Sequence, residues 1–156
     1  DSNPPERLMT ASAVLLLSVH LVATAAMVGL IWFVQIVHYP LFAAVGQDRF
    51  VAYEVEHQRR TSYVVGPPMA VEGVTSIVLL VAAPEGVGPL LPIVGVGLLA
   101  VIHASTVFLQ VPAHAALARS HDVGSIRRLV RTNWIRTIGW SARGGLAVAM
   151  LVEAAP

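Results

Sequence analysis

Apolar residues along this chain gather in four long runs, and polar residues gather between them. A helix needs about 20 mostly apolar residues to cross the hydrocarbon core of a bilayer. The first three runs meet this requirement with at most one formal charge each, whereas the fourth contains two arginines. The pattern predicts an all-α chain whose membrane-crossing helices span residues 11–38, 61–83, 87–118 and 133–152.

The polar segments between the runs indicate how the helices are joined. Residues 39–60 and 119–132 form two long, charged connections, while residues 84–86 form a tight turn. Because short turns join antiparallel neighbours, we expect an integral membrane four-helix bundle with up-down-up-down topology. Both long connections carry loosely helical patterns, so the helices are expected to extend beyond the membrane on that side. Residues 1–10 are predicted to be a polar tail, and residues 11–156 a single domain.

Composition supports lipid as the surrounding solvent. The chain is 56% hydrophobic and 12% charged, whereas soluble domains are about 45–50% apolar and about 25% charged. The absence of cysteine excludes disulfides, thiolate metal sites and thiol nucleophiles. The net charge of +1, with arginines beside apolar runs, excludes nucleic acid as a partner.

The distribution of arginine predicts how the chain is oriented. Arginines cluster in and beside the two long connections, and only Arg7 lies on the other side. The positive-inside bias therefore places the long connections in the cytoplasm and both termini outside. Every basic residue is arginine and none is lysine, which is typical of GC-rich bacterial coding. The predicted location is the bacterial inner membrane.

Polar residues recur at helical spacing on every predicted helix. Residues three and four apart share a helix face, and polar groups within a bilayer face the bundle interior or a wet cavity. The four faces therefore predict a polar pocket that opens to the cytoplasm. They comprise Thr24, Gln35 and His38; Glu54, His57, Thr61, Glu72 and Ser76; His103, Thr106, Gln110 and His114; and Asn133, Arg136, Trp140 and Arg143.

Three of these residues are expected to meet deep in the membrane. Glu72, His103 and Arg143 lie about 12–17 Å inside the span ends at roughly 1.5 Å per residue. One interpretation is a structural ion pair with the histidine as a hydrogen-bonding neighbour, because a buried charge needs a partner. The other is a catalytic cluster that transfers protons or holds substrate, because ionisable groups inside membranes are candidates for function. His20 is expected to stand apart from this layer.

A second group nearer the cytoplasmic interface has the chemistry of a metal or haem site. Glu54 and His57 have the Glu-x-x-His spacing of di-iron bundles, and His38 and His114 add imidazoles. These four residues are candidate metal ligands, and the three histidines are candidate cofactor ligands, for iron, copper or haem. The di-iron pattern uses two such motifs and this chain has one, so solvated interfacial groups remain the alternative. His121 is expected to be exposed.

Several strings resemble a family of small four-span bacterial membrane proteins. They are Gln35-Ile-Val-His-Tyr-Pro-Leu-Phe42, His57-Gln-Arg-Arg60, Pro67-Pro-Met-Ala-Val-Glu72 and Asn133-Trp-Ile-Arg-Thr137. The resemblance covers most of the chain and implies a fold but no mechanism. A more distant likeness to anthrone-oxygenase-like four-span proteins is architectural only, so no catalytic residue is carried over from them.

Three functions fit these features. The one that we favour is a metal- or haem-dependent membrane oxidoreductase acting on a lipophilic substrate such as a quinone, because polar residues recur at compatible depth on all four helices. The second is a non-enzymatic accessory subunit of a larger membrane complex or homo-oligomer. The third is a small proton-coupled carrier, which the intramembrane Glu72 favours and the lack of an inverted repeat opposes.

Overall fold

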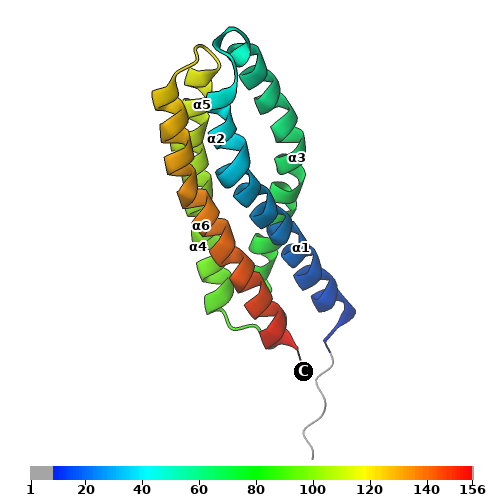
Figure 1. The fold of residues 1–156 in the computed structure, drawn as a ribbon. Coiled ribbons are helices and arrows are strands. Elements are labelled where there is room, and N and C mark those ends of the chain that lie inside the picture. Colours follow the sequence, from blue (N-terminus) through cyan, green and yellow to red (C-terminus); the bar gives the residue numbers. More distant parts are fainter. Residues whose placement is uncertain (1–8, 156) are drawn as a thin grey trace, which may run out of the picture.

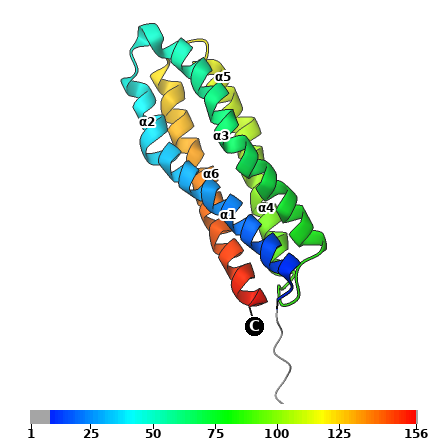
Figure 2. The ribbon, with the colours of Figure 1, turned by 90° about the vertical axis from the view of Figure 1, so that its right-hand side faces the viewer.

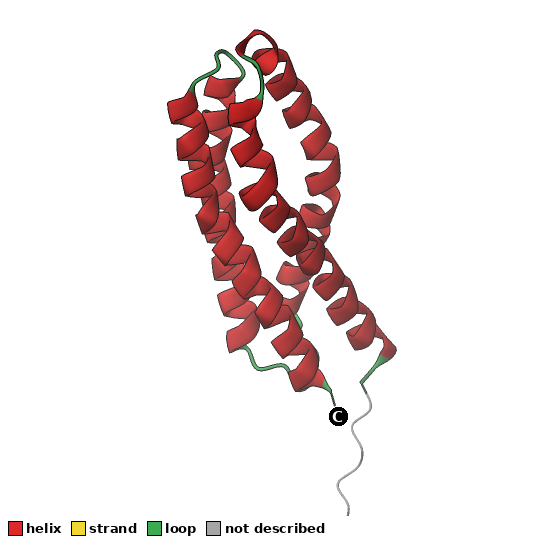
Figure 3. Ribbon diagram, viewed as in Figure 1, coloured by secondary structure: helices red, strands yellow, loops and turns green. Residues whose placement is uncertain are grey.

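A computed structural model describes residues 9–155 of the chain, and these residues form four helical rods. Most of the predicted polar tail lies outside the described residues. The described chain contains no strand, so the predicted all-α class with four helices is confirmed (Figure 3). The rods are α1 (Ala11–Phe33) with η1 (Val34–His38), α2 (Tyr39–Leu41) and η2 (Phe42–Ala44); α3 (Gln47–Val81); α4 (Leu90–Ser105) with η3 (Thr106–Gln110) and α5 (Val111–Leu117); and α6 (Val123–Ala154).

The rods pack side by side into one elongated bundle. The connections from α2 to α3 and from α5 to α6 lie at one end, and the turn from α3 to α4 lies at the other end with the C-terminus (Figures 1 and 2). Helix α6 packs against α1 and α4, and α3 packs against the same two helices. Each helix therefore contributes one face to a shared interior.

Local chemistry fixes the helix ends. Thr10 Oγ1 accepts a hydrogen bond from the backbone N–H of Ala13 at the start of α1 (3.2 Å). The carboxylate of Asp122 accepts hydrogen bonds from the N–H groups of Gly124 (3.1 Å) and Ser125 (2.8 Å), so Asp122 caps α6. In the turn before α4, Gly86 has φ +93°, and a Cβ there would lie 2.8 Å from the Glu153 carbonyl oxygen, so this turn requires glycine.

Two helices widen into π-helical turns just before a proline. The turn η1 ends at His38, two residues before Pro40, and η3 ends at Gln110, two residues before Pro112. Proline has no N–H and its ring crowds the carbonyl four residues earlier. A wider turn accommodates both effects without ending the helix. Because each π turn contains an extra residue, the side chains after it that face the bundle interior are not the ones that 3.6 residues per turn would place there.

The interior contains three apolar clusters stacked along the bundle. The middle cluster is Met27, Ile31, Ile102 and Trp140. There α4 and α6 approach closely, because a Cβ on Gly139 would lie 2.7 Å from Cγ1 of Ile102. The other clusters lie at the two ends and include Phe42, Phe50, Leu117 and Leu129, and Leu17, Leu79 and Met150.

The outer surface is apolar over most of its length. Leu15, Val81 and Phe108 have 65%, 76% and 73% of their surface exposed. Three rods are long and apolar enough to cross a membrane, namely residues 11–44, 47–81 and 90–117. Helix α6 does not meet these criteria, yet its Arg136 and Arg143 are buried in the bundle rather than on its outer face.

Candidate metal centre

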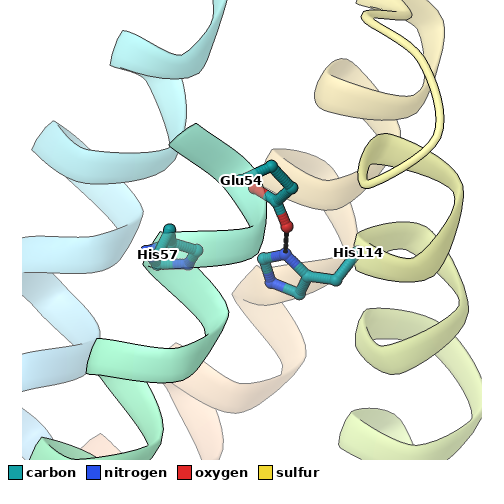
Figure 4. Close-up of side chains that lie close together, drawn as sticks. All are labelled: Glu54, His57 and His114. Atoms are coloured by element: carbon teal, nitrogen blue, oxygen red, sulfur yellow. Dashed lines mark hydrogen bonds and ion pairs between the residues drawn. The ribbon is translucent and has the colours of Figure 1, made fainter. Parts of the chain in front are cut away.

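Glu54, His57 and His114 meet near the end of the bundle that holds the long connections. Glu54 and His57 lie three residues apart on α3, and His114 approaches Glu54 from α5 (Figure 4). One potential ligand atom from each residue lies within 4.8 Å of the others. The predicted group from the Glu-x-x-His motif and His114 is therefore brought together by two helices that are distant in sequence.

The carboxylate of Glu54 is fully buried and only half satisfied. Its Oε1 accepts hydrogen bonds from Nδ1 of His114 (2.6 Å) and from Nε2 of Gln58 (3.0 Å). Its Oε2 is also buried, and it has no hydrogen-bond partner within residues 9–155. A buried carboxylate oxygen without a partner is costly unless a hydrogen-bond donor or a cation joins it.

His38 stands behind His57 rather than within the three-residue group. Its Nε2 lies 2.8 Å from Nδ1 of His57, and Oγ1 of Thr61 lies 3.0 Å from the same nitrogen. These contacts hold the His57 ring through one nitrogen and leave Nε2 as the available ligand atom. Histidines that bind metals are commonly held in this way by a hydrogen bond to the other ring nitrogen.

Tyr39 is a site residue that the helical spacing missed. Its side chain is 4% exposed, and its hydroxyl lies 2.9 Å from Nε2 of His114. Spacing of 3.6 residues per turn placed His38 on the inward face, but the π turn η1 brings the next residue inward as well. The aromatic residue within the string His-Tyr-Pro was the available signal in the sequence.

A buried polar network from η1 and α6 extends next to Tyr39. Gln35 Oε1 accepts hydrogen bonds from Nδ2 of Asn133 (2.9 Å) and Oγ1 of Thr137 (3.3 Å). Arg136 donates from Nη1 to Oδ1 of Asn133 (3.3 Å), and its guanidinium lies 5.3 Å from the centre of the Trp140 ring. The inward faces predicted for these two helices therefore join at this level.

An apolar groove of about 450 Å³ leads from the outer surface to the histidines. It runs between the first rod and α3, and its walls include Leu30, Phe33 and Val65. His38 and His57 line it as well. Its volume falls within the range of about 300–1,000 Å³ that is usual for small-molecule sites. His57, one of the three grouped residues, thus also lines a groove on the apolar surface.

The deep layer forms a tightly bonded ion pair. Glu72 Oε1 accepts hydrogen bonds from Nε of Arg143 (2.7 Å) and Oγ1 of Thr24 (3.1 Å), and its Oε2 accepts from Nε1 of Trp140 (2.9 Å). Arg143 also donates to Oγ of Ser76 (2.9 Å) and to the carbonyl of Gly95. Both charged groups are therefore neutralised and fully hydrogen-bonded.

Two expectations about histidines at this depth need correction. His103 donates from Nδ1 to the carbonyl of Leu99 in its own helix (2.9 Å), and among the described residues it has no hydrogen bond to Glu72 or Arg143. His20, which was expected to stand apart, lines a small cavity together with Arg143. The direction in which each histidine side chain points, rather than its depth along the helix, explains why His103 does not reach the ion pair and why His20 does not stand apart.

The expectation that His121 is exposed is also wrong. Its ring packs edge-on against Phe50, with the ring centres 4.7 Å apart, and both ring nitrogens are buried. The neighbouring Asp122 lies outside the membrane-crossing segments. Its hydrogen bonds from Ser125 and Gly124 lower the pKa of that carboxyl. The packing of the His121 ring against Phe50 therefore shows that this end of the bundle is packed rather than open.

Comparison of the chain with protein-family models, with curated proteins and with solved structures gives no match. The chemistry of the three-residue group therefore has to be judged from its geometry. Two donor atoms that share a metal ion at about 2.0–2.2 Å each lie at most about 4.4 Å apart. The observed separation of up to 4.8 Å is close to this limit, so these three residues could hold a metal ion.

Proposed function

We propose that this chain is an integral membrane enzyme that binds a non-haem metal ion at Glu54, His57 and His114 and carries out redox chemistry on a lipophilic substrate. The observation that carries the proposal is the buried Glu54 carboxylate, whose Oε2 has no hydrogen-bond partner in the described chain. Burying a carboxylate is strongly unfavourable unless it is paired. The two imidazoles beside it add neutral donors, and a cation would complete the group.

The donor set favours iron among the metals considered. Two histidines and one carboxylate that leave positions open are typical of non-haem iron oxygenases. Haem is less well supported, because a carboxylate, Glu54, is part of the group, whereas haem iron in proteins is held by histidine, cysteine, methionine or tyrosine. The metal would supply redox chemistry, and the groove would bring the substrate to it.

The groove supports a substrate that arrives from the bilayer. Its apolar walls suit a hydrocarbon or a ring system, and its histidines offer hydrogen bonds at one place. A quinone-like molecule has both features. The proposed path runs from lipid, between the first rod and α3, to the face of His57.

The proposed setting is an up-down-up-down bundle in the bacterial cytoplasmic membrane, with the long connections and the metal group towards the cytoplasm. The three apolar rods support membrane insertion. We include α6 as the fourth span, because Arg143 pairs with Glu72 inside the bundle and so avoids the cost of a charge in lipid. The proton-coupled carrier is less well supported, because both oxygens of Glu72 already accept hydrogen bonds.

Metal analysis of protein purified in mild detergent without chelator tests the proposal. We expect about one equivalent of iron in the unmodified chain, and loss of most of it in the Glu54→Gln and His114→Ala variants. Glu56→Gln and His121→Ala are matched controls, because Glu56 lies two residues away on α3 and pairs with Arg59 and Arg60 instead. Folded, metal-free protein that also fails to take up added iron would refute the proposed function.

A further inference from the structure

Exposed aromatic side chains that carry a polar atom lie at one level of the bundle. Trp32 and Trp134 are exposed on adjacent rods, with their ring centres 5.7 Å apart. Tyr63 is exposed on α3 at the same height, because Trp32 and Tyr63 are each six residues along the chain from the contact between His38 and His57. Tryptophan and tyrosine gather where the hydrocarbon of a bilayer meets its headgroups. In the proposed membrane setting, this level is the cytoplasmic boundary of the hydrocarbon core.

The length of α3 and the position of its charges agree with that boundary. From Tyr63 to its end, α3 rises about 27 Å at 1.5 Å per residue, close to the roughly 30 Å of hydrocarbon in a bilayer. The one charged residue in this stretch, Glu72, is buried, whereas Arg59 and Arg60 are exposed just before it. By the same rise, His57 lies about 9 Å beyond Tyr63, at the depth of the lipid headgroups.

The groove crosses this boundary. Leu30, Val64 and Val65 line its part on the hydrocarbon side. His38 and His57 line its part on the headgroup side. Val65 and His57 are eight residues apart on α3, so the groove extends over about 12 Å along the helix. A molecule that fills it therefore has a hydrocarbon chain at one end and a polar group at the other.

The polar end of the groove has no uncompensated charge. The two charged residues that line it, Glu56 and Arg60, pair with each other (2.5 Å). Nε2 of His38 lies 2.8 Å from Nδ1 of His57, and Nδ1 of His38 has no hydrogen-bond partner within residues 9–155. A neutral imidazole nitrogen pairs well with an uncharged oxygen. An anionic group there would lose its water without gaining a free cation as its partner.

We propose that the groove binds a single-chain amphiphile whose head is an uncharged hydroxyl or carbonyl oxygen. The head contacts His38 beside His57. The chain lies between the first rod and α3, along Leu30, Val64 and Val65. The inference rests on the proposed function and names the class of its substrate, because His57 belongs both to the groove and to the metal group. Phospholipids and ionised fatty acids do not fit, since their heads are charged.

Photolabelling of the protein in phospholipid nanodiscs tests this assignment. Two probes are used, namely hexadecanol with a photoreactive diazirine beside the hydroxyl and hexadecanol with the diazirine at the middle of the chain. We expect the first to label the chain around His38 and His57, and the second to label it around Leu30 and Val65. Unlabelled hexadecanol should compete with both probes, whereas ionised hexadecanoate should compete at least about tenfold less well.

Substitutions on α3 test the groove with a matched control. Val64→Trp fills the groove, and Ile77→Trp is the control, because both residues are exposed on α3 and only Val64 lines the groove. Labelling should fall by about tenfold or more in Val64→Trp, since part of the chain is excluded, and should stay unchanged in Ile77→Trp. His38→Phe removes one hydrogen bond to the head and should weaken binding of hexadecanol by about three- to tenfold.

The same samples distinguish this inference from the proposed function, because neither Val64 nor Ile77 belongs to the metal group. Equal labelling of Val64→Trp and Ile77→Trp, or equal competition by hexadecanoate and hexadecanol, would overturn this inference. Iron-loaded protein without labelling at the groove would overturn this inference alone. Labelling at the groove of a protein that takes up no iron would instead overturn the proposed function.

Discussion

The ion pair between Glu72 and Arg143 provides a test of how this bundle keeps charge in an apolar interior. The exposed fractions of the two side chains are 0% and 2%. Replacing Arg143 with methionine keeps much of the side-chain length and removes the guanidinium. The carboxylate of Glu72 would keep only Thr24 and Trp140 as donors.

The expected loss is large because an uncompensated charge is left buried. Removing one partner of a buried pair costs about 3–5 kcal/mol. The hydrogen bonds from Arg143 to Ser76 and to the Gly95 carbonyl are lost as well. In the double variant Glu72→Gln/Arg143→Met no charge remains, and replacing a buried pair with neutral groups is often close to neutral in stability. We therefore expect the double variant to be more stable than Arg143→Met alone.

Unfolding in detergent, followed by circular dichroism and by tryptophan fluorescence, measures these differences. The exposed Glu56–Arg60 pair on α3 is the matched control, because surface pairs contribute little; Glu56→Gln and Arg60→Met should leave the unfolding midpoint unchanged. The reasoning is refuted if Arg143→Met unfolds like these controls. It is also refuted if the losses of the two single variants simply add in the double variant, since coupled partners deviate from additivity.

Two further predictions concern a helix contact and a helix cap. Gly139→Val should destabilise the bundle by about 1–3 kcal/mol, because the added Cβ would lie 2.7 Å from Ile102; unchanged unfolding would mean that α4 and α6 do not approach closely. The pKa of Asp122 is lower in the folded protein than its unfolded value of 3.8. The ionised carboxylate therefore stabilises the fold at pH values above 3.8, and this stabilisation is lost as the pH falls through the lower pKa of the folded state. Unfolding midpoints measured from pH 5 downward should show this dependence and should lose part of it in Asp122→Asn, which still caps without titrating.

Much of the fold and part of the site followed from regularities that every helix obeys. Runs of apolar residues predicted the rods, and the i to i+3 spacing placed Glu54 beside His57. The sequence did not reveal Tyr39, because the count of 3.6 residues per turn fails across the π turn η1. The same failure put Thr106 on the inward face, whereas the structure buries Ser105 and bonds it to Gln110 (3.0 Å).

The depth of a side chain along the bundle was predicted more successfully than the direction in which the side chain points. Glu72 and Arg143 lie at matching depth and meet, but His103 shares that depth and bonds to its own helix. Position along a helix depends only on residue number, whereas the direction of a side chain relative to its neighbours depends on how each helix is rotated in the bundle. That rotation is set by packing contacts that one sequence does not display.

The prolines after the two π turns divide the first and third rods each into two parts with independent angular settings. A residue in an ordinary helix is rotated by about 100° from its predecessor, so a change of register at one point would otherwise turn every later side chain. Pro40 and Pro112 fix where the extra width sits on the first and third rods. On the third rod, His103 and His114 thus lie on opposite sides of such a point. Glu54, His57 and Glu72, by contrast, share the single helix α3, so a substitution that turns α3 moves both the metal group and the ion pair.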